Sequence, residues 1–128
     1  MNLVIDIGNT RVKAALFEGD ELKHFFVFSN MLDLFHSKIV DSYVIDRAIF
    51  VTVVSNIDAH INRLRKFFPV TEYTVHTDIP IKNLYQTTDT LGGDRLIGAI
   101  SANNMFPDTN VLMIDAGTCI KYNFVNSN

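Results

Sequence analysis

The sequence predicts an α/β fold with a mixed sheet, and three observations point to it. The chain opens with three strand-like segments in succession, separated by short polar turns. A uniformly apolar run, residues 48–54, then has the character of a buried parallel strand. Segments with helical periodicity lie on either side of that run. At 128 residues and 48% hydrophobic content, the chain can bury one domain-sized core but not two.

The first three strands are predicted at residues 3–7, 12–17 and 22–28, in the order of a meander. Ser29 or Asn30 can cap a helix that follows them. This helix is expected to bury one apolar face before it ends. The face consists of Leu32, Phe35 and Ile39, the last of which is its expected end.

After the apolar run, Ser55 and Asn56 can cap a second helix, which Pro69 closes. A short strand at 70–75 completes this part of the chain. Three meander strands followed by helix, strand, helix and strand is the order of the ribonuclease-H-like topology. The expected apolar face of the second helix consists of Ile57, Ile61, Leu64 and Phe68.

Composition limits the partners and the location of the protein. The net charge of -3 argues against nucleic acid as the main ligand, and the longest apolar run is too short to span a bilayer. A single cysteine excludes an internal disulfide, and the chain enters its first strand without a leader-like segment. We therefore expect a cytoplasmic protein that binds neither nucleic acid nor membranes.

A candidate phosphate site follows the first strand. Asp6 stands at its end, where a carboxylate can hold Mg2+, which prefers one or two protein oxygens together with substrate phosphates. Gly8 allows the backbone to approach an anion, and Asn9 and Thr10 supply an amide and a hydroxyl. Lys13 can add a positive charge. For this segment alone, a plain hairpin turn is an equally good explanation, because Gly-Asn favours hairpins.

The same pattern recurs near the end of the sequence. Residues 111–121 again form an apolar strand that ends in Ile-Asp-x-Gly and continues through Thr118 to Lys121. The recurrence indicates an internal duplication, with a first domain over 1–108 and the start of a second, truncated copy over 109–128. Two such turns that face each other across a cleft would hold a nucleotide polyphosphate from both sides. This design resembles that of the actin-like ATPases.

A third motif, Leu-Gly-Gly-Asp-Arg at 91–95, follows a loop predicted over 77–90 and opens a helix that runs to about Met105. Asp94 is either the cap of this helix or a general base beside a substrate hydroxyl. Arg95 can bind a substrate carboxylate or amide.

Together the three motifs resemble the type III pantothenate kinase family, over the whole chain. They are Asp6-Ile7-Gly8-Asn9-Thr10 with Lys13, Leu91-Gly92-Gly93-Asp94-Arg95, and Asp115-Ala116-Gly117-Thr118. The resemblance implies that ATP phosphorylates the terminal hydroxyl of pantothenate, the first step of coenzyme A synthesis. It also implies Mg2+, a monovalent cation such as K+ or NH4+, and a homodimer.

The resemblance further implies a role for individual residues. Asp94 would be the general base, and Tyr85, Gly92, Gly93 and Arg95 would form the pantothenate site. The residues implied for the ATP phosphates are Asp6, Gly8, Asn9, Thr10, Lys13, Gly117 and Thr118, and those implied for the metal are Asp6 and Asp115.

Two positions depart from the family pattern. The family usually has a threonine and then an aspartate, which help to hold phosphate and the monovalent cation, where this sequence has Lys121 and Asn123. Lys121 either replaces a bound cation with a tethered one or impairs the site. Asn123 is neutral where the family has an anionic aspartate ligand, so the K+ requirement stays open.

Length is a further departure, because family members are about twice as long, which corresponds to two domains of ordinary size. We expect a fragment that binds ATP weakly and has little or no kinase activity by itself, unless it is a naturally short relative. Its last segment, 111–128, would be a hairpin without the rest of its sheet. Two other functions stay open: a non-catalytic regulatory or interaction relative of the kinase, and another actin-like ATPase or phosphotransferase.

Overall fold

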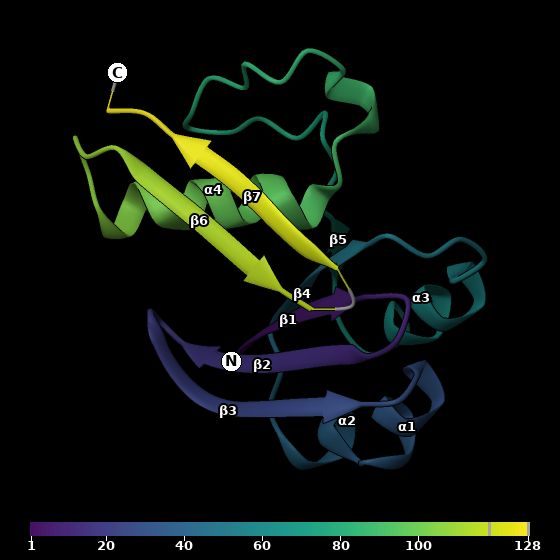
Figure 1. The fold of residues 1–128 in the computed structure, drawn as a ribbon. Helices are drawn as coiled ribbons and strands as arrows, with labels where there is room; N and C mark the ends of the chain where they lie inside the picture. The colour runs from purple at the N-terminus through teal and green to yellow at the C-terminus, as the bar shows by residue number, and fades with distance from the viewer. Residues whose placement is uncertain (118, 128) are drawn as a thin grey trace. The chain divides into compact units, whose positions relative to one another are not determined.

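The computed structural model describes residues 1–117 and 119–127 of the chain. The chain divides into two compact units, Met1–Tyr73, called unit 1, and Thr74–Asn128, called unit 2. Figure 1 shows the strands and helices of both units. The family-implied residue Thr118 lies outside the described residues.

Unit 1 is built on a five-stranded mixed sheet with the strand order β3-β2-β1-β4-β5. The strands β1, β2 and β3 form an antiparallel meander, and β4 and β5 continue the sheet in parallel with β1. The predicted meander and the predicted parallel strand are thus confirmed. The strands are β1 (Asn2–Ile7), β2 (Val12–Glu18), β3 (Glu21–Phe28), β4 (Arg47–Thr52) and β5 (Val70–Glu72).

The core of unit 1 lies on one face of this sheet. Along β1, Leu3, Ile5 and Ile7 are buried, whereas Val4 between them is 39% exposed, as the alternation of side chains along a strand requires. The helices α1 (Met31–His36), α2 (Ile39–Ser42) and α3 (Asp58–Leu64) supply the other side of the core. Their buried members are Met31, Leu34, Ile39, Ile61 and Leu64.

The first helix differs from its prediction in length and in its buried face. Asn30 is its cap, because the side-chain oxygen accepts from the N–H groups of residues 32 and 33 at 2.8 and 3.0 Å. The helix ends at His36 rather than residue 39, since Lys38 takes a left-handed conformation with φ of 60°. The expected burial of Leu32 is wrong, because a helix that begins at Met31 turns residue 32 outward, 50% exposed.

The second helix begins later than expected. The predicted caps Ser55 and Asn56 lie outside it, and α3 starts at Asp58 without a side-chain cap bond. Asn56 has a φ of 62° and belongs to the turn between β4 and α3. Ile61 and Leu64 are buried as predicted.

Unit 2 consists of the long loop with the short helix η1 (Thr88–Thr90), the helix α4 (Gly93–Met105), and a separate two-stranded sheet. That sheet is the antiparallel hairpin of β6 (Val111–Ala116) and β7 (Ile120–Val125), so the expected isolated hairpin is confirmed. α4 contacts both strands. The contacts between residues divide this chain after residue 73, so α4 belongs to unit 2. The predicted division after residue 108 concerns a longer protein with two complete domains, and it stays a prediction.

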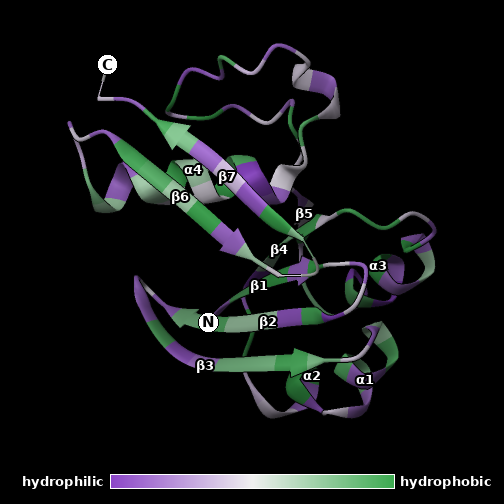
Figure 2. Cartoon of the chain, viewed as in Figure 1, coloured by the Kyte–Doolittle hydropathy of each residue, from purple (hydrophilic) through white to green (hydrophobic). Residues whose placement is uncertain are grey.

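The helix α4 packs on one face of the hairpin at a glycine. A Cβ built on Gly98 would lie 2.6 Å from Sδ of Met113 in β6. The opposite face of the hairpin is apolar and open to solvent, and Figure 2 shows the green apolar stretches along both strands. Its residues, 58–68% exposed, are Leu112, Ile114, Ile120, Tyr122 and Phe124. In the described part of the chain, no helix has the length and apolarity needed to cross a membrane.

Candidate functional site

In unit 1, β1 carries Asp6 to the turn that leads into β2. Nζ of Lys13 lies 3.3 Å from Oδ2 of Asp6, and the two residues face each other across the antiparallel pair. Their side chains are 40–50% exposed, so the ion pair is weak and both groups are accessible to a ligand. The N–H of Gly8 donates to the carbonyl of Arg11 at 3.0 Å, and a Cβ at residue 8 would lie 3.2 Å from that oxygen. The tight turn therefore favours glycine at this position.

The carboxyl end of the neighbouring parallel strand, β4, opens into a small cavity that the sequence analysis did not identify. Its volume is about 180 Å³, and its polar walls come from the β4–α3 turn, α3 and the end of β5. Ligands of open α/β sheets bind beyond the carboxyl ends of the strands. The sequence signal for this cavity is Ser55-Asn56, directly after the buried strand, a pair that also fits a helix cap. The polar lining residues are Thr52, Ser55, Asn56, Asp58, Arg65 and Glu72.

In unit 2, three charged side chains from three elements form an ionic cluster, Asp94–Asp115–Lys121. The Lys121 ammonium pairs with Asp94, in the first turn of α4, and lies 3.1 Å from Oδ2 of Asp115, directly opposite in β6. The Lys121 and Asp94 side chains are only 28% and 21% exposed. The hydrogen bond to Asp94, aided by Asp115, raises the pKa of Lys121 against the opposing effect of burial.

The position of Asp94 argues against its role as a helix cap. The N-cap residue is Gly92, which makes no side-chain bond, and Asp94 is the second residue of the helix. A Cβ on Gly92 would lie 2.4 Å from Oδ1 of Asp94. Glycine at residue 92 thus leaves room for the carboxylate to turn toward Lys121.

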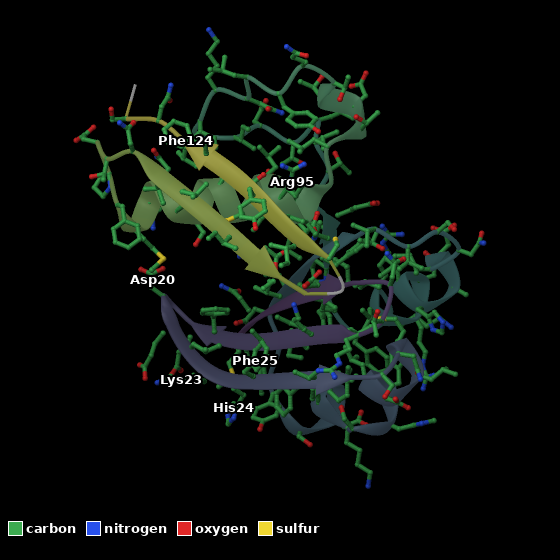
Figure 3. All side chains as sticks on the ribbon, in the orientation of Figure 1. Asp20, Lys23, His24, Phe25, Arg95 and Phe124 are labelled. Carbon is green, nitrogen blue, oxygen red and sulfur yellow. The ribbon has the colours of Figure 1, made fainter. Side chains whose placement is uncertain are left out.

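Next to the cluster, Arg95 extends from the start of α4 to β7 (Figure 3). Its Nε and Nη2 donate to Oδ1 of Asn123 at 2.8 and 2.6 Å, and Nη2 also donates to the Tyr122 carbonyl at 3.0 Å. The guanidinium carbon lies 5.3 Å from the ring centroid of Tyr85. Nδ2 of Asn123 is buried and has no hydrogen-bond partner among the described residues.

Tyr85 and Arg95 also line a cavity of about 630 Å³ in unit 2, which is large enough for a small organic molecule. The other walls come from the predicted loop, from α4 and from the end of β7. Apolar side chains such as Leu91 and Leu96 lie there beside polar ones such as Lys82 and Asn103. The site can therefore bury an apolar body and hold a charged end.

The remaining predicted site residues have simpler surroundings. Asn9 and Thr10 are exposed in the first turn, and Gly93 is the first residue of α4. The N–H of Gly117 donates to the Cys119 carbonyl at 3.1 Å. No group of three or more His, Cys, Asp or Glu side chains is arranged to hold a metal ion within residues 1–117 and 119–127.

Fold and site together define the class of protein. Unit 1 has a mixed sheet with a carboxylate and a glycine in its first turn, and in unit 2 Arg95, which follows Asp94 in α4, lines a cavity of small-molecule size. These features define a mixed α/β protein. The chain belongs to the type III pantothenate kinase family, whose family model matches residues 2–128. The resemblance seen in the three motifs is thus confirmed.

Individual relatives carry the same name. Type III pantothenate kinases from Bacteroides fragilis and Flavobacterium johnsoniae are both 41% identical to the chain, over 129 and 131 residues. The alignments cover 99% and 100% of this chain but 53% of each relative. The chain therefore spans about half the length of the curated relatives it matches. A crystal structure from Campylobacter jejuni, assigned to the Baf family of transcriptional activators, shares the fold with a TM-score of 0.53 at 19% identity, covering 98% of this chain and 49% of that one.

Proposed function

We propose that the protein to which this chain belongs transfers phosphate from ATP to pantothenate, and that unit 2 supplies the pantothenate site and the base. The observation that carries the proposal is the start of α4. There Asp94 and Arg95 stand side by side, and Arg95 lines the 630 Å³ cavity. Family membership over residues 2–128 supplies the reaction class.

The cavity chemistry suits a ligand with a carboxylate and an apolar body. Two nitrogens of Arg95 are held by β7, and the third, Nη1, takes part in none of those bonds and can donate to a substrate carboxylate. The Tyr85 ring stacks near the guanidinium and keeps it oriented. Gly92 acts by leaving space for the Asp94 carboxylate.

Phosphoryl transfer depends on positioning and on charge neutralisation more than on covalent catalysis. Asp94 as an ionised carboxylate can accept the proton of the substrate hydroxyl. Asp6 is accessible and suits Mg2+, which needs one or two protein oxygens beside the phosphates. Lys13, Gly8 and the exposed turn residues would bind the phosphates, with Gly117 and Thr118 on the second turn. Asp6 and Asp115 each contact an ammonium group, but Lys121 is more shielded from water than Lys13, at 28% against 50% exposed, so Asp115 suits Mg2+ less well than Asp6 does.

The strand order of unit 1 supports the ribonuclease-H-like, actin-like assignment, with helices placed after β3 and β4. The two hairpins support an internal duplication. In β1–β2, Asp6 faces Lys13, and in β6–β7, Asp115 faces Lys121 in the same register. A second domain that completes the sheet of β6 and β7, and a homodimer, belong to this proposal.

A non-catalytic regulatory relative is the second candidate, and one observation favours it. The proposed base, Asp94, is already paired with Lys121, where the family pattern has a neutral threonine.

Kinase turnover separates the two candidates. The protein, at the full length that its gene encodes, is assayed for pantothenate-dependent ADP release. We expect turnover, and a loss of about 10²–10⁴-fold in kcat for Asp94→Asn, the range of a general base. Asp20→Asn, in the exposed β2–β3 turn (Figure 3), serves as a matched carboxylate control without effect. A folded protein without turnover at saturating substrates would favour the regulatory relative.

A further inference from the structure

We infer that the ammonium group of Lys121 is a permanent cation between Asp94 and Asp115, so that this position takes no K+ or NH4+ from solution. The inference concerns binding in unit 2, and it rests on the proposed function only for its kinetic consequence. The sequence left open whether Lys121 replaces a bound cation or impairs the site.

The convergence of three elements on one ammonium group is the first observation. Lys121 lies in β7, Asp115 lies opposite in β6, and Asp94 comes from the first turn of α4, 27 residues before the lysine. Both carboxylates contact the same nitrogen. An ammonium nitrogen has three N–H donors, so it can serve two carboxylates at once.

Charge balance is the second observation. Two carboxylates held close together and partly shielded from water need a cation or a proton beside them. Here Lys121 and Arg95 supply two positive charges against Asp94 and Asp115, and the next residue on that face, Asn123, is neutral. The cluster by itself has two carboxylates and one ammonium group, and the neighbouring Arg95, held by Asn123 and Tyr122, brings the formal charge of the four groups to zero, so that no free cation is needed to neutralise them.

The chemistry of the group is the third observation. The lysine head group is an ammonium ion with a covalent tether, and it occupies the place that a free NH4+ or K+ would need. A tethered group has a high effective concentration, so an ion from solution would have to displace it at a large disadvantage. Among the described residues, Lys13, at the equivalent position of the first hairpin, forms an ion pair with its cross-strand partner Asp6 alone. The added contact with Asp94 therefore makes Lys121 a bridge between two carboxylates.

Direct cation binding tests the inference without any enzymatic readout. The full-length protein is titrated with Tl+, a probe for K+, and binding is followed by 205Tl NMR with competition by K+. We expect no saturable site in the natural protein and a new K+-competed site in Lys121→Ser, with affinity increased at least about tenfold. Lys121→Ser should also unfold at a higher temperature in NH4Cl than in choline chloride, whereas the natural protein should not.

A matched control comes from unit 1. Lys23 also lies between two carboxylates, Glu18 and Glu21 at 3.4 and 2.7 Å, with its side chain 29% exposed (Figure 3). Lys23→Ser should create no cation site, because those carboxylates are 67% and 71% exposed. If Lys121→Ser fails to fold, Lys121→Met and the titration of the natural protein still decide the question. Saturable, K+-competed Tl+ binding by the natural protein that Asp115→Asn abolishes would overturn the inference.

The kinetic arm distinguishes this inference from the proposed function. Turnover that is equal in KCl and choline chloride supports both. Turnover that requires K+ overturns the inference and leaves the kinase assignment intact. If turnover is absent in every salt, the kinase assignment fails, and the Tl+ titration alone decides whether Lys121 fills the cation position.

Discussion

The hairpins β1–β2 and β6–β7 share a register but differ in what covers them. When the two Asp-x-Gly turns are aligned, Leu3 corresponds to Leu112, and the cross-strand pair Leu3–Leu16 corresponds to Leu112–Phe124. Leu3 and Leu16 are 0% exposed, whereas Leu112 and Phe124 are 59% and 68% exposed. The face that unit 1 buries beneath α1, α2 and α3 is the face that unit 2 leaves open.

This difference separates what the local sequence determines, the strands and their register, from what tertiary packing determines, the burial of their side chains. The apolar side chains and the acid–lysine pair recur in both hairpins, so the local sequence specifies the strands and their register. Burial, by contrast, depends on the helices that follow the meander in unit 1. The chain spans about half the length of its relatives, and the apolar face of β6–β7 lies uncovered among the described residues.

The largest expected effect comes from truncating equivalent leucines. Leu3→Ala should lower the free energy of unfolding by about 2–5 kcal/mol, because it leaves a cavity in a closed core. Leu112→Ala in the same chain should change it by no more than about 0.5 kcal/mol, since that side chain is already in water. Urea unfolding followed by circular dichroism measures both. Equal losses would contradict the comparison, and a larger loss at Leu112 in the full-length protein would show that the face becomes covered.

The sequence predicted the elements of the fold better than their ends. Period-two apolar patterns located the meander, and the uniform apolar run located β4. The helix ends were missed at Lys38 and Asn56, because a left-handed backbone conformation in a residue other than glycine has no clear sequence signal.

The candidate site was predictable only in part. The motif around Asp94 and Arg95 was visible in the sequence. Its contacts with Lys121 and Asn123 join residues 27 and 28 positions apart, and no local periodicity reports such contacts. The cavity at the end of β4 was missed because its polar residues also fit an ordinary helix cap.

A substitution in the contact between α4 and the β6–β7 hairpin should have a smaller effect on stability. Gly98→Val should lower the free energy of unfolding by about 1 kcal/mol, the low end of the cost of overpacking, because Sδ of Met113 lies 2.6 Å from the built Cβ but belongs to the flexible end of its side chain, which can move. Met113→Ala in the same chain should restore part of the loss by removing the obstructing atoms. The pair forms a double-mutant cycle measured by thermal unfolding. A loss that Met113→Ala leaves unchanged would mean that the helix-to-strand contact is not the cause.

Each unit has a buried polar atom without a hydrogen-bond partner among the described residues: Oη of Tyr73 in unit 1 and Nδ2 of Asn123 in unit 2. The smallest expected effect on stability comes from replacing Tyr73. Burial raises the pKa of Tyr73 above its ordinary value of 10.0. The native state then holds this proton more tightly than the unfolded chain does. Stability linked to Tyr73 is therefore fully present below pH 10.0 and is lost as the pH rises through the higher native pKa.

Tyr73→Phe removes both the unpartnered hydroxyl and its titration. At pH 8 the variant should be as stable as the natural chain, or more stable by up to about 1 kcal/mol, because an unsatisfied buried hydroxyl is costly. Above pH 10 the stability of the variant relative to the natural chain should increase. Only the natural chain must then either keep a buried phenol protonated or bury a phenolate. Urea unfolding of the two chains between pH 8 and pH 11 measures the difference, in which all other titrating groups cancel. A variant that is less stable at pH 8, with a gap that does not change toward pH 11, would mean that the hydroxyl is hydrogen-bonded to water and that unit 1 accommodates a polar group within its core.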